Sequence, residues 1–121
     1  MAQDTQVSLR ENGGLVVLDI RGEITTFADA ALTGAYRTAS DGGAKSILLN
    51  FSGVDYLNSA GISIIIGLLI EARRAEQQLV MTGLTPHYHK IFQMMGLAQH
   101  APVFETEDEA VQFVAKDTVV S

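Results

Sequence analysis

Few side chains in this chain are placed where they could react, be modified or bind a partner, and Ser59 is the strongest candidate. It follows the apolar run Ile47–Phe51 and a loop that contains glycine, and it precedes a long apolar segment. A hydroxyl where a strand and loop lead into a helix lies at the tip of a rigid element, near backbone N–H groups without intrahelical partners. Such a hydroxyl suits phosphate chemistry or contact with a partner. A plain helix cap, the commonest use of serine there, is the alternative.

Two catalytic motifs come close to matching and fail. A hydrolase nucleophile at Ser59 needs glycine two positions before and two after it. Gly61 satisfies the second position, but Leu57 occupies the first. A phosphate-binding loop around Lys45 needs glycine directly before the lysine, where Ala44 stands. No catalytic constellation remains, so we do not expect an enzyme, and a nucleotide-binding hydrolase is the weakest alternative.

The histidines do not predict a metal site, and the chain has no cysteine. His87 and His89 are two residues apart on an expected helix, so their side chains diverge, and His100 has no convincing spacing to them. We expect surface histidines, no metal and no cofactor.

Charge and hydropathy narrow the class of protein. The net charge of −6 argues against nucleic-acid binding and favours partners with basic surfaces. The first residues, 1–5, lack a basic segment followed by an apolar run, so they do not resemble a signal peptide. The longest apolar run, 62–70, is too short to cross a bilayer. We expect a cytoplasmic protein without direct membrane insertion.

The first half of the chain predicts a hairpin and a helix. Strands are expected near 7–10 and 15–20, joined by a turn at Asn12-Gly13-Gly14. Thr25 or Thr26 can cap a helix from Phe27 to Ala39. Its apolar stripe, expected to face the core, comprises Phe27, Ala31, Leu32, Ala35 and Tyr36.

The second half predicts alternating strands and helices. Strands are expected at 47–51, which would be the centre of the sheet, at 79–82 and at 103–104, with a loop at 52–57. Helices are expected at 59–78, at 86–95 after Thr85, and after the capping-box spacing of Thr106–Glu109. The order β-β-α-β-α-β-α-β-α predicts an α/β fold: one open mixed sheet of four to five strands with about four helices, forming a single domain over residues 1–121.

The helix after Ser59 is apolar on more than one side. The face expected to meet the core comprises Ile62, Ile65, Ile66 and Leu69. The opposite side comprises Ala60, Ile64, Gly67 and Glu71. A solvated face is normally polar, so this strip is either a second buried face or an exposed docking surface that begins at the serine.

Four stretches of the chain match a known family in the right order. The most specific is Ile47–Gly61, with its strand, loop and Asn-Ser-Ala-Gly junction. The others are Gly22-Glu23-Ile24, Leu79–Gly83 with Pro86, and Ile91–Leu97. Over roughly residues 5–116 the chain resembles the STAS domain, named for sulphate transporters and anti-sigma factor antagonists.

The resemblance implies partner switching. Stand-alone bacterial members bind an anti-sigma factor that is also a serine kinase; phosphorylation of the junction serine breaks the complex, and a PP2C-type phosphatase reverses the modification. Ser59 matches the phosphoacceptor. The partner-binding residues that we expect are Asn58, Ser59, Ala60, Gly61, Ile64, Gly67, Thr25 and Thr26.

Three of these positions depart from the family pattern. Asn58 and Thr25 stand where aspartates are usual, and Ala60 replaces a second hydroxyl residue. Ser59 is therefore the only hydroxyl residue of the junction motif. The loss of the carboxylate at Asn58 mildly favours an alternative: a STAS scaffold subunit that is not phosphorylated, such as that of a bacterial lipid-transport ABC complex.

Overall fold

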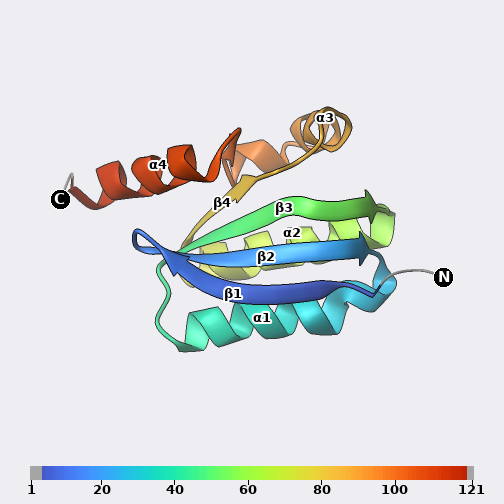
Figure 1. Ribbon diagram of the computed structural model, residues 1–121, viewed down its shortest axis with the longest axis horizontal. Coiled ribbons are helices and arrows are strands. Elements are labelled where there is room, and N and C mark those ends of the chain that lie inside the picture. The colour runs from blue at the N-terminus through green and yellow to red at the C-terminus, as the bar shows by residue number, and fades with distance from the viewer. Residues whose placement is uncertain (1–3, 120–121) are drawn as a thin grey trace.

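The computed structural model describes residues 4–119, with the side chains of residues 4–116. Its strands form one sheet in the order β1-β2-β3-β4-β5, in which β1 is antiparallel to β2 and the other neighbours are parallel (Figure 1). The strands are β1 (Gln6–Asn12), β2 (Leu15–Ile24), β3 (Ser46–Leu57), β4 (Gln78–Thr82) and β5 (Val103–Phe104). The predicted element order and open mixed sheet are confirmed, with β3 at the centre.

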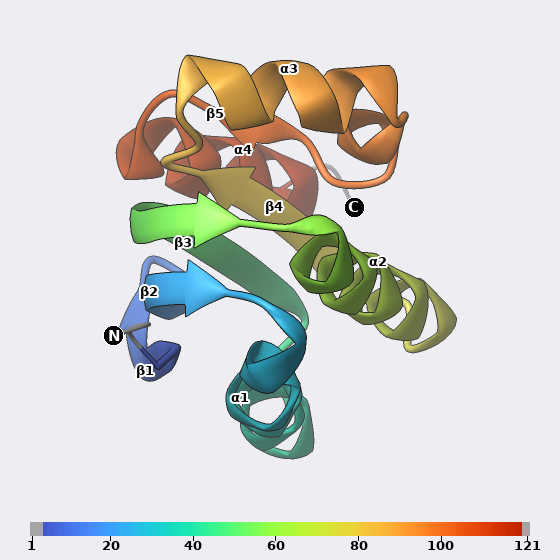
Figure 2. The same ribbon diagram turned by 90° about the vertical axis from the view of Figure 1, so that its right-hand side faces the viewer.

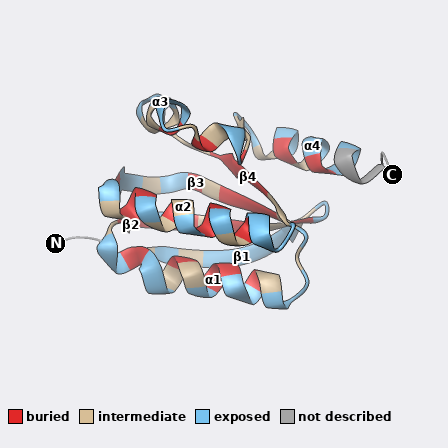
Figure 3. Cartoon of the chain, turned by 180° about the vertical axis from the view of Figure 1, so that it is seen from behind, coloured by how far each residue is buried: buried red, intermediate tan, exposed pale blue. Residues whose placement is uncertain are grey.

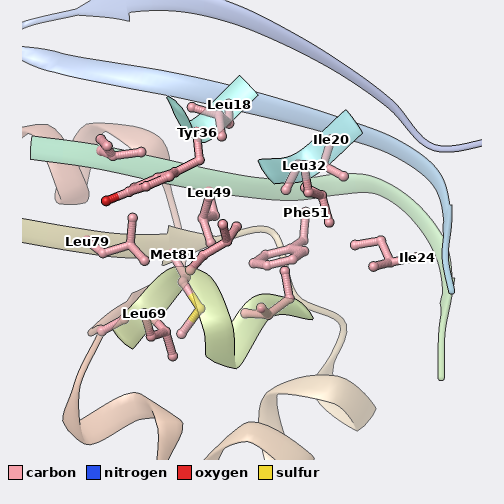
Figure 4. Close-up of a cluster of buried hydrophobic side chains, with 14 of the residues drawn as sticks. Leu18, Ile20, Ile24, Leu32, Tyr36, Leu49, Phe51, Leu69, Leu79 and Met81 are labelled. Atoms are coloured by element: carbon pink, nitrogen blue, oxygen red, sulfur yellow. The ribbon is translucent and has the colours of Figure 1, made fainter. Parts of the chain in front are cut away.

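Helices cover both faces of the sheet. The described helices are α1 (Asp29–Asp41), α2 (Ser59–Arg74), α3 (Pro86–Met94) and α4 (Glu107–Val119), with short 3-10 turns η1 (Thr26–Ala28) and η2 (Leu97–Gln99). The larger apolar cluster lies between the sheet and α1 and α2 (Figure 4). Phe92 of α3 extends this cluster by an edge-on contact with Phe51, with ring centroids 6.0 Å apart. A smaller cluster holds α4 on the other face, through Ala110 and Val114.

The central strand is longer than predicted, because residues 52–57 continue β3 and do not form a loop. This extension pairs with an equally unexpected extension of β2, from Arg21↔Gly53 to Ile24↔Leu57. One register shift precedes this pairing, between Asp19 and Arg21, and a second lies within it, between Gly22 and Glu23. Gly22 has a φ of 92°, a conformation that favours glycine. Bulged pairing interrupts the alternation of apolar and polar residues, so the local pattern resembles a loop.

The start of α1 also differs from the prediction. Residues 26–28 form η1, and the α-helix begins only at Asp29. A 3-10 turn advances by three residues per turn, which changes the phase of the apolar stripe. Ala28 therefore takes the fully buried position, and Phe27, which we expected in the core, is 90% exposed.

The later helices follow their predicted caps. Thr85 accepts a hydrogen bond from the Tyr88 N–H at 3.3 Å, and the capping box at Thr106 and Glu109 is reciprocal. α2 ends at Arg74, four residues before the predicted end at Gln78.

Candidate functional site

The side chain that caps α2 is Asn58, not Ser59. Asn58 has an extended backbone, and its Oδ1 accepts a hydrogen bond from the Gly61 N–H at 2.9 Å. A capping oxygen sits one residue before the helix, from where it reaches the third N–H of the first turn. Ser59 is instead the first helical residue, so a capping role does not explain its hydroxyl.

The Ser59 hydroxyl is open to solvent. No described residue forms a hydrogen bond with it, while the Ser59 carbonyl accepts one from Ser63 Oγ at 3.1 Å. The first turn of α2 contains no acidic residue. The positive end of the helix dipole is therefore not neutralised within its own first turn, and an anion attached to Ser59 would be stabilised there.

Gly61 allows α2 to start against the end of β2. A Cβ atom at this position would lie 2.0 Å from the Ile24 carbonyl oxygen, a distance that no side chain tolerates. The same carbonyl accepts a hydrogen bond from the Asn58 N–H at 3.3 Å. The close approach fixes the serine relative to the sheet, at the end that Figure 2 presents to the viewer.

The turn after β2 lies at this same end and contacts α2. Thr25 is half-buried and caps η1, its Oγ1 accepting from the Phe27 N–H at 3.3 Å. Thr26 is exposed. The structure therefore brings the two threonines to the end of the molecule that carries Asn58, Ser59, Ala60 and Gly61.

The side of α2 that comprises Ala60, Ile64, Gly67 and Glu71 is neither fully buried nor fully exposed. Ile64 is half-buried against the main apolar cluster, whereas Gly67 is exposed, and nothing would meet a Cβ there within 4 Å. Both residues line a shallow groove between α1 and α2. These two helices run side by side in Figure 3. Arg37 of α1 crosses the groove to Glu71, with Nη2 and Oε1 3.3 Å apart.

The expected core face of α2 is mostly confirmed. Ile62, Ile65 and Leu69 are buried, but Ile66 is only partly so. Leu68 is also buried, so the core face is rotated slightly from the predicted one toward α1.

The two segments nearest Ser59 carry only negative charge, and the nearest arginine, Arg21, lines a hollow together with Asp55. Residues 22–34 and 54–70 contain Glu23, Asp29 and Asp55 and no lysine or arginine. None of these three carboxylates forms an ion pair with a described residue. A surface that docks here meets an acidic border.

The principal charged cluster lies elsewhere and has a structural role. Arg10 of β1 donates to Asp19 Oδ2 at 2.6 Å and to Glu107 Oε1 at 2.5 Å, which ties the start of α4 to the sheet. These charged hydrogen bonds lower the pKa of both carboxyl groups and raise the pKa of Arg10. Asn50 and Asn12 add hydrogen bonds to Asp19 and Glu107. The carboxylates are fully engaged, so they are unsuited to proton transfer.

The described residues give no sign of metal binding or of a membrane span. Within residues 4–119, no three or more His, Cys, Asp or Glu side chains are grouped so that they could hold a metal ion. His100 lies beside Arg73, with Nδ1 and Nη1 3.2 Å apart. Over the same range no helix is both long and apolar enough to cross a membrane.

Of the side chains at this end, Phe27 is the one that sequence reasoning assigned wrongly. Helical periodicity places it in the core, yet it is the most exposed large hydrophobic side chain of the described residues. The two adjacent threonines, both candidate caps, are the only local signal that the helix start was uncertain.

Comparison with known proteins gives one consistent result. The family model described as "STAS domain" matches residues 6–110. A curated relative, the "Putative anti-sigma factor antagonist BtrV" of Bordetella bronchiseptica, is 23% identical over 97 residues, which cover 80% of this chain and 84% of the relative.

Solved structures show the same fold. An anti-sigma factor antagonist from Mycobacterium paratuberculosis superposes with a TM-score of 0.81 at 20% identity, covering 95% of this chain and 99% of that one. The Bacillus cell fate determinant SpoIIAA, solved in its phosphorylated form, gives a TM-score of 0.69 at 25% identity, covering 89% of this chain and 98% of the other.

Proposed function

The chain belongs to the STAS domain family, and from this premise we propose that it is an anti-sigma factor antagonist that is switched off by phosphorylation of Ser59. The proposed partner is an anti-sigma factor that is also a serine kinase, and we propose that a PP2C-type phosphatase removes the phosphoryl group from Ser59. The Bordetella relative, the similar protein from Mycobacterium paratuberculosis and SpoIIAA are each named as anti-sigma factor antagonists, which supports the antagonist role.

The observation that carries the proposal is that Asn58, and not Ser59, caps α2. The amide of Asn58 caps the helix, which leaves the Ser59 hydroxyl exposed and without a partner among the described residues. A kinase can therefore reach the hydroxyl without unfolding the helix start. Asparagine in place of the usual aspartate keeps the hydrogen bond of the cap and removes only its charge.

The proposed docking surface combines the two segments at this end. Its members are Thr25, Thr26, Asn58, Ser59, Ala60 and Gly61, continued along the groove by Ile64 and Gly67. Rigid presentation of these residues favours binding, because little conformational freedom is lost when a partner docks.

Phosphorylation would change this surface by charge alone. A phosphoserine carries about −1.5 to −2 charges at neutral pH. The helix N-terminus stabilises that charge in the free protein, whereas a docked partner would have to desolvate it beside the acidic border. A penalty of about 3 kcal/mol would weaken binding more than a hundredfold.

The test uses purified anti-sigma factors with serine kinase activity from the source organism. Each is incubated with ATP and this protein, and intact-mass analysis followed by peptide mapping should find one phosphoryl group on Ser59. The Ser63→Ala variant, which alters another exposed serine one turn along the helix, should be modified like the wild type, and Ser59→Ala should not be modified.

Binding is measured separately by calorimetry. Ser59→Ala should keep wild-type affinity, and Ser59→Asp should weaken binding. Equal affinities for these two variants, or phosphate found only at other residues, would contradict the proposed switch. If the protein instead co-purifies with an ABC ATPase and with no serine kinase, the scaffold alternative is correct.

A further inference from the structure

One exposed aromatic ring is not explained by the fold. Phe27 is 90% exposed, whereas the next most exposed large hydrophobic side chain of the described residues, Met94, is 77% exposed and lies at the last residue of α3. Phenylalanine side chains bury much apolar surface when they pack, so full exposure of the ring is unfavourable unless a partner covers it.

The ring is held outward by an ordered turn. The Phe27 N–H donates to Thr25 Oγ1 at 3.3 Å, and the Ala28 N–H donates to the Thr25 carbonyl at 3.0 Å. Ala28 is completely buried directly after the ring. Phe27 is therefore presented by a capped turn between β2 and α1 whose next residue is anchored in the core, and a partner loses little entropy in meeting it.

Phe27 and Ser59 are fixed to the same point of the backbone. The Ile24 carbonyl accepts from the Asn58 N–H and lies against Gly61, and the turn that carries Phe27 begins at the next residue. η1 also contacts α2. A surface that docks over the serine is thus continuous with one that covers the ring.

The charge at this end selects the kind of partner. The flanking carboxylates Glu23, Asp29 and Asp55 have no ion-pair partner among the described residues. A second copy would bring the same acidic border and a net charge of −6, so self-association here is disfavoured. Basic side chains around an apolar pocket would complement both features.

We infer that Phe27 is the apolar anchor of this surface and that it inserts into a hydrophobic pocket, bordered by basic residues, on the anti-sigma factor. This inference rests on the proposed function, because it identifies the partner with that protein. It adds an anchor residue and the chemistry of the complementary pocket.

The experiment titrates purified anti-sigma factors of the source organism into the wild type, Phe27→Ala and Met94→Ala by calorimetry. Phe27→Ala should weaken binding about thirtyfold, as expected of a central interface aromatic. The matched control Met94→Ala should stay within twofold of the wild type. Thermal unfolding of both variants should match the wild type, because both side chains are largely exposed.

Salt dependence tests the basic border. Binding of the wild type should weaken as the NaCl concentration rises, and Asp29→Asn should reduce the slope of that dependence. Phe27→Ala should leave the slope unchanged, because the ring carries no charge.

The results distinguish a wrong anchor residue from a wrong proposed function. If Ser59→Asp weakens binding while Phe27→Ala binds within twofold of the wild type, the anchor is wrong and the proposed function stands. If no anti-sigma factor binds the wild type, both fail. Self-association of the wild type that Phe27→Ala abolishes, measured by sedimentation, would assign the ring to a second copy and overturn the inference.

Discussion

The first turns of α2 and α4 are built in opposite ways. α4 begins with three acidic residues, a reciprocal capping box and an arginine that ties Glu107 to the sheet. α2 begins with one amide cap, no acidic residue in its first turn and a glycine pressed against a carbonyl of β2. Both are helix N-termini of the same fold, but only the start of α2 has an exposed hydroxyl, that of Ser59, and no acidic residue in the first turn to neutralise the positive end of the helix dipole.

The difference separates structure from function. At α4 the negative side chains complement the helix dipole and the ion pairs hold the helix in place. At α2 the packing of Gly61 and the Asn58 amide hold the helix in place without a charged side chain. The start of α2 therefore stays available for a negative group that is added later.

The largest expected effect comes from filling the space at Gly61. Gly61→Ala would place a Cβ against the Ile24 carbonyl, so we expect a loss of about 3 kcal/mol in the free energy of unfolding. The matched control is Gly67→Ala in the same helix, where nothing would meet the Cβ. That variant should gain about 0.5–1 kcal/mol, because alanine favours the helix. Urea denaturation measures both, and equal effects would contradict the steric hold on α2.

Removing the charged hold on α4 should have a smaller effect. Arg10→Met keeps an unbranched chain but loses the ion pairs to Asp19 and Glu107. Because the arginine side chain is 43% exposed, we expect a loss of only about 1 kcal/mol at pH 7 after allowing for solvent screening.

This loss should depend on pH. The arginine lowers the pKa of the two carboxyl groups below their ordinary values of 3.8 and 4.5. A carboxyl group whose pKa is lower in the folded state stabilises the fold above its ordinary value and loses that contribution as the pH falls through the folded value. The difference between wild type and Arg10→Met should therefore be full above about pH 5 and shrink below pH 4. A difference that does not change down to pH 2.5 would contradict the assignment.

Removing a capping side chain should cost more stability than removing the neighbouring Ser59 hydroxyl. Asn58→Ala should cost about 1 kcal/mol, and Thr106→Ala a similar amount at α4, because each removes a side-chain acceptor from a first turn. Asn58→Asp should keep full stability. Ser59→Ala should stay within about 0.5 kcal/mol of the wild type, because its hydroxyl has no partner among the described residues. A larger cost for Ser59→Ala than for Asn58→Ala would show that the serine is the cap after all.

The smallest effect concerns the dipoles themselves. Ser59→Asp adds a negative charge to the first turn of α2 and should raise the free energy of unfolding by about 0.5 kcal/mol. Asp108→Asn removes a charge from the first turn of α4 and should lower it by a similar or smaller amount. Both effects should fade in 1 M salt. If Ser59→Asp destabilises the protein, the start of α2 is not a favourable place for a phosphate.

Much of the fold was predictable because it follows from local patterns. Apolar runs, the turn at residues 12–14 and the capping signals at Thr85 and Thr106 predict the element order and the mixed sheet. The paired extensions of β2 and β3 were not predictable. Their hydrogen bonds join residues that are far apart in the sequence, and the bulges remove the alternation by which a strand is recognised.

The candidate site divides in the same way. The sequence by itself determined that Ser59 stands at the start of a helix, because the change from a strand pattern to a helical one is local. Only the tertiary structure decided that Asn58 is the cap and that Phe27 points outward. The cap of α2 lies one residue before Ser59, and α1 begins at Asp29, two residues after the predicted start at Phe27. The packing of Gly61 and Ala28 against the rest of the fold sets these positions.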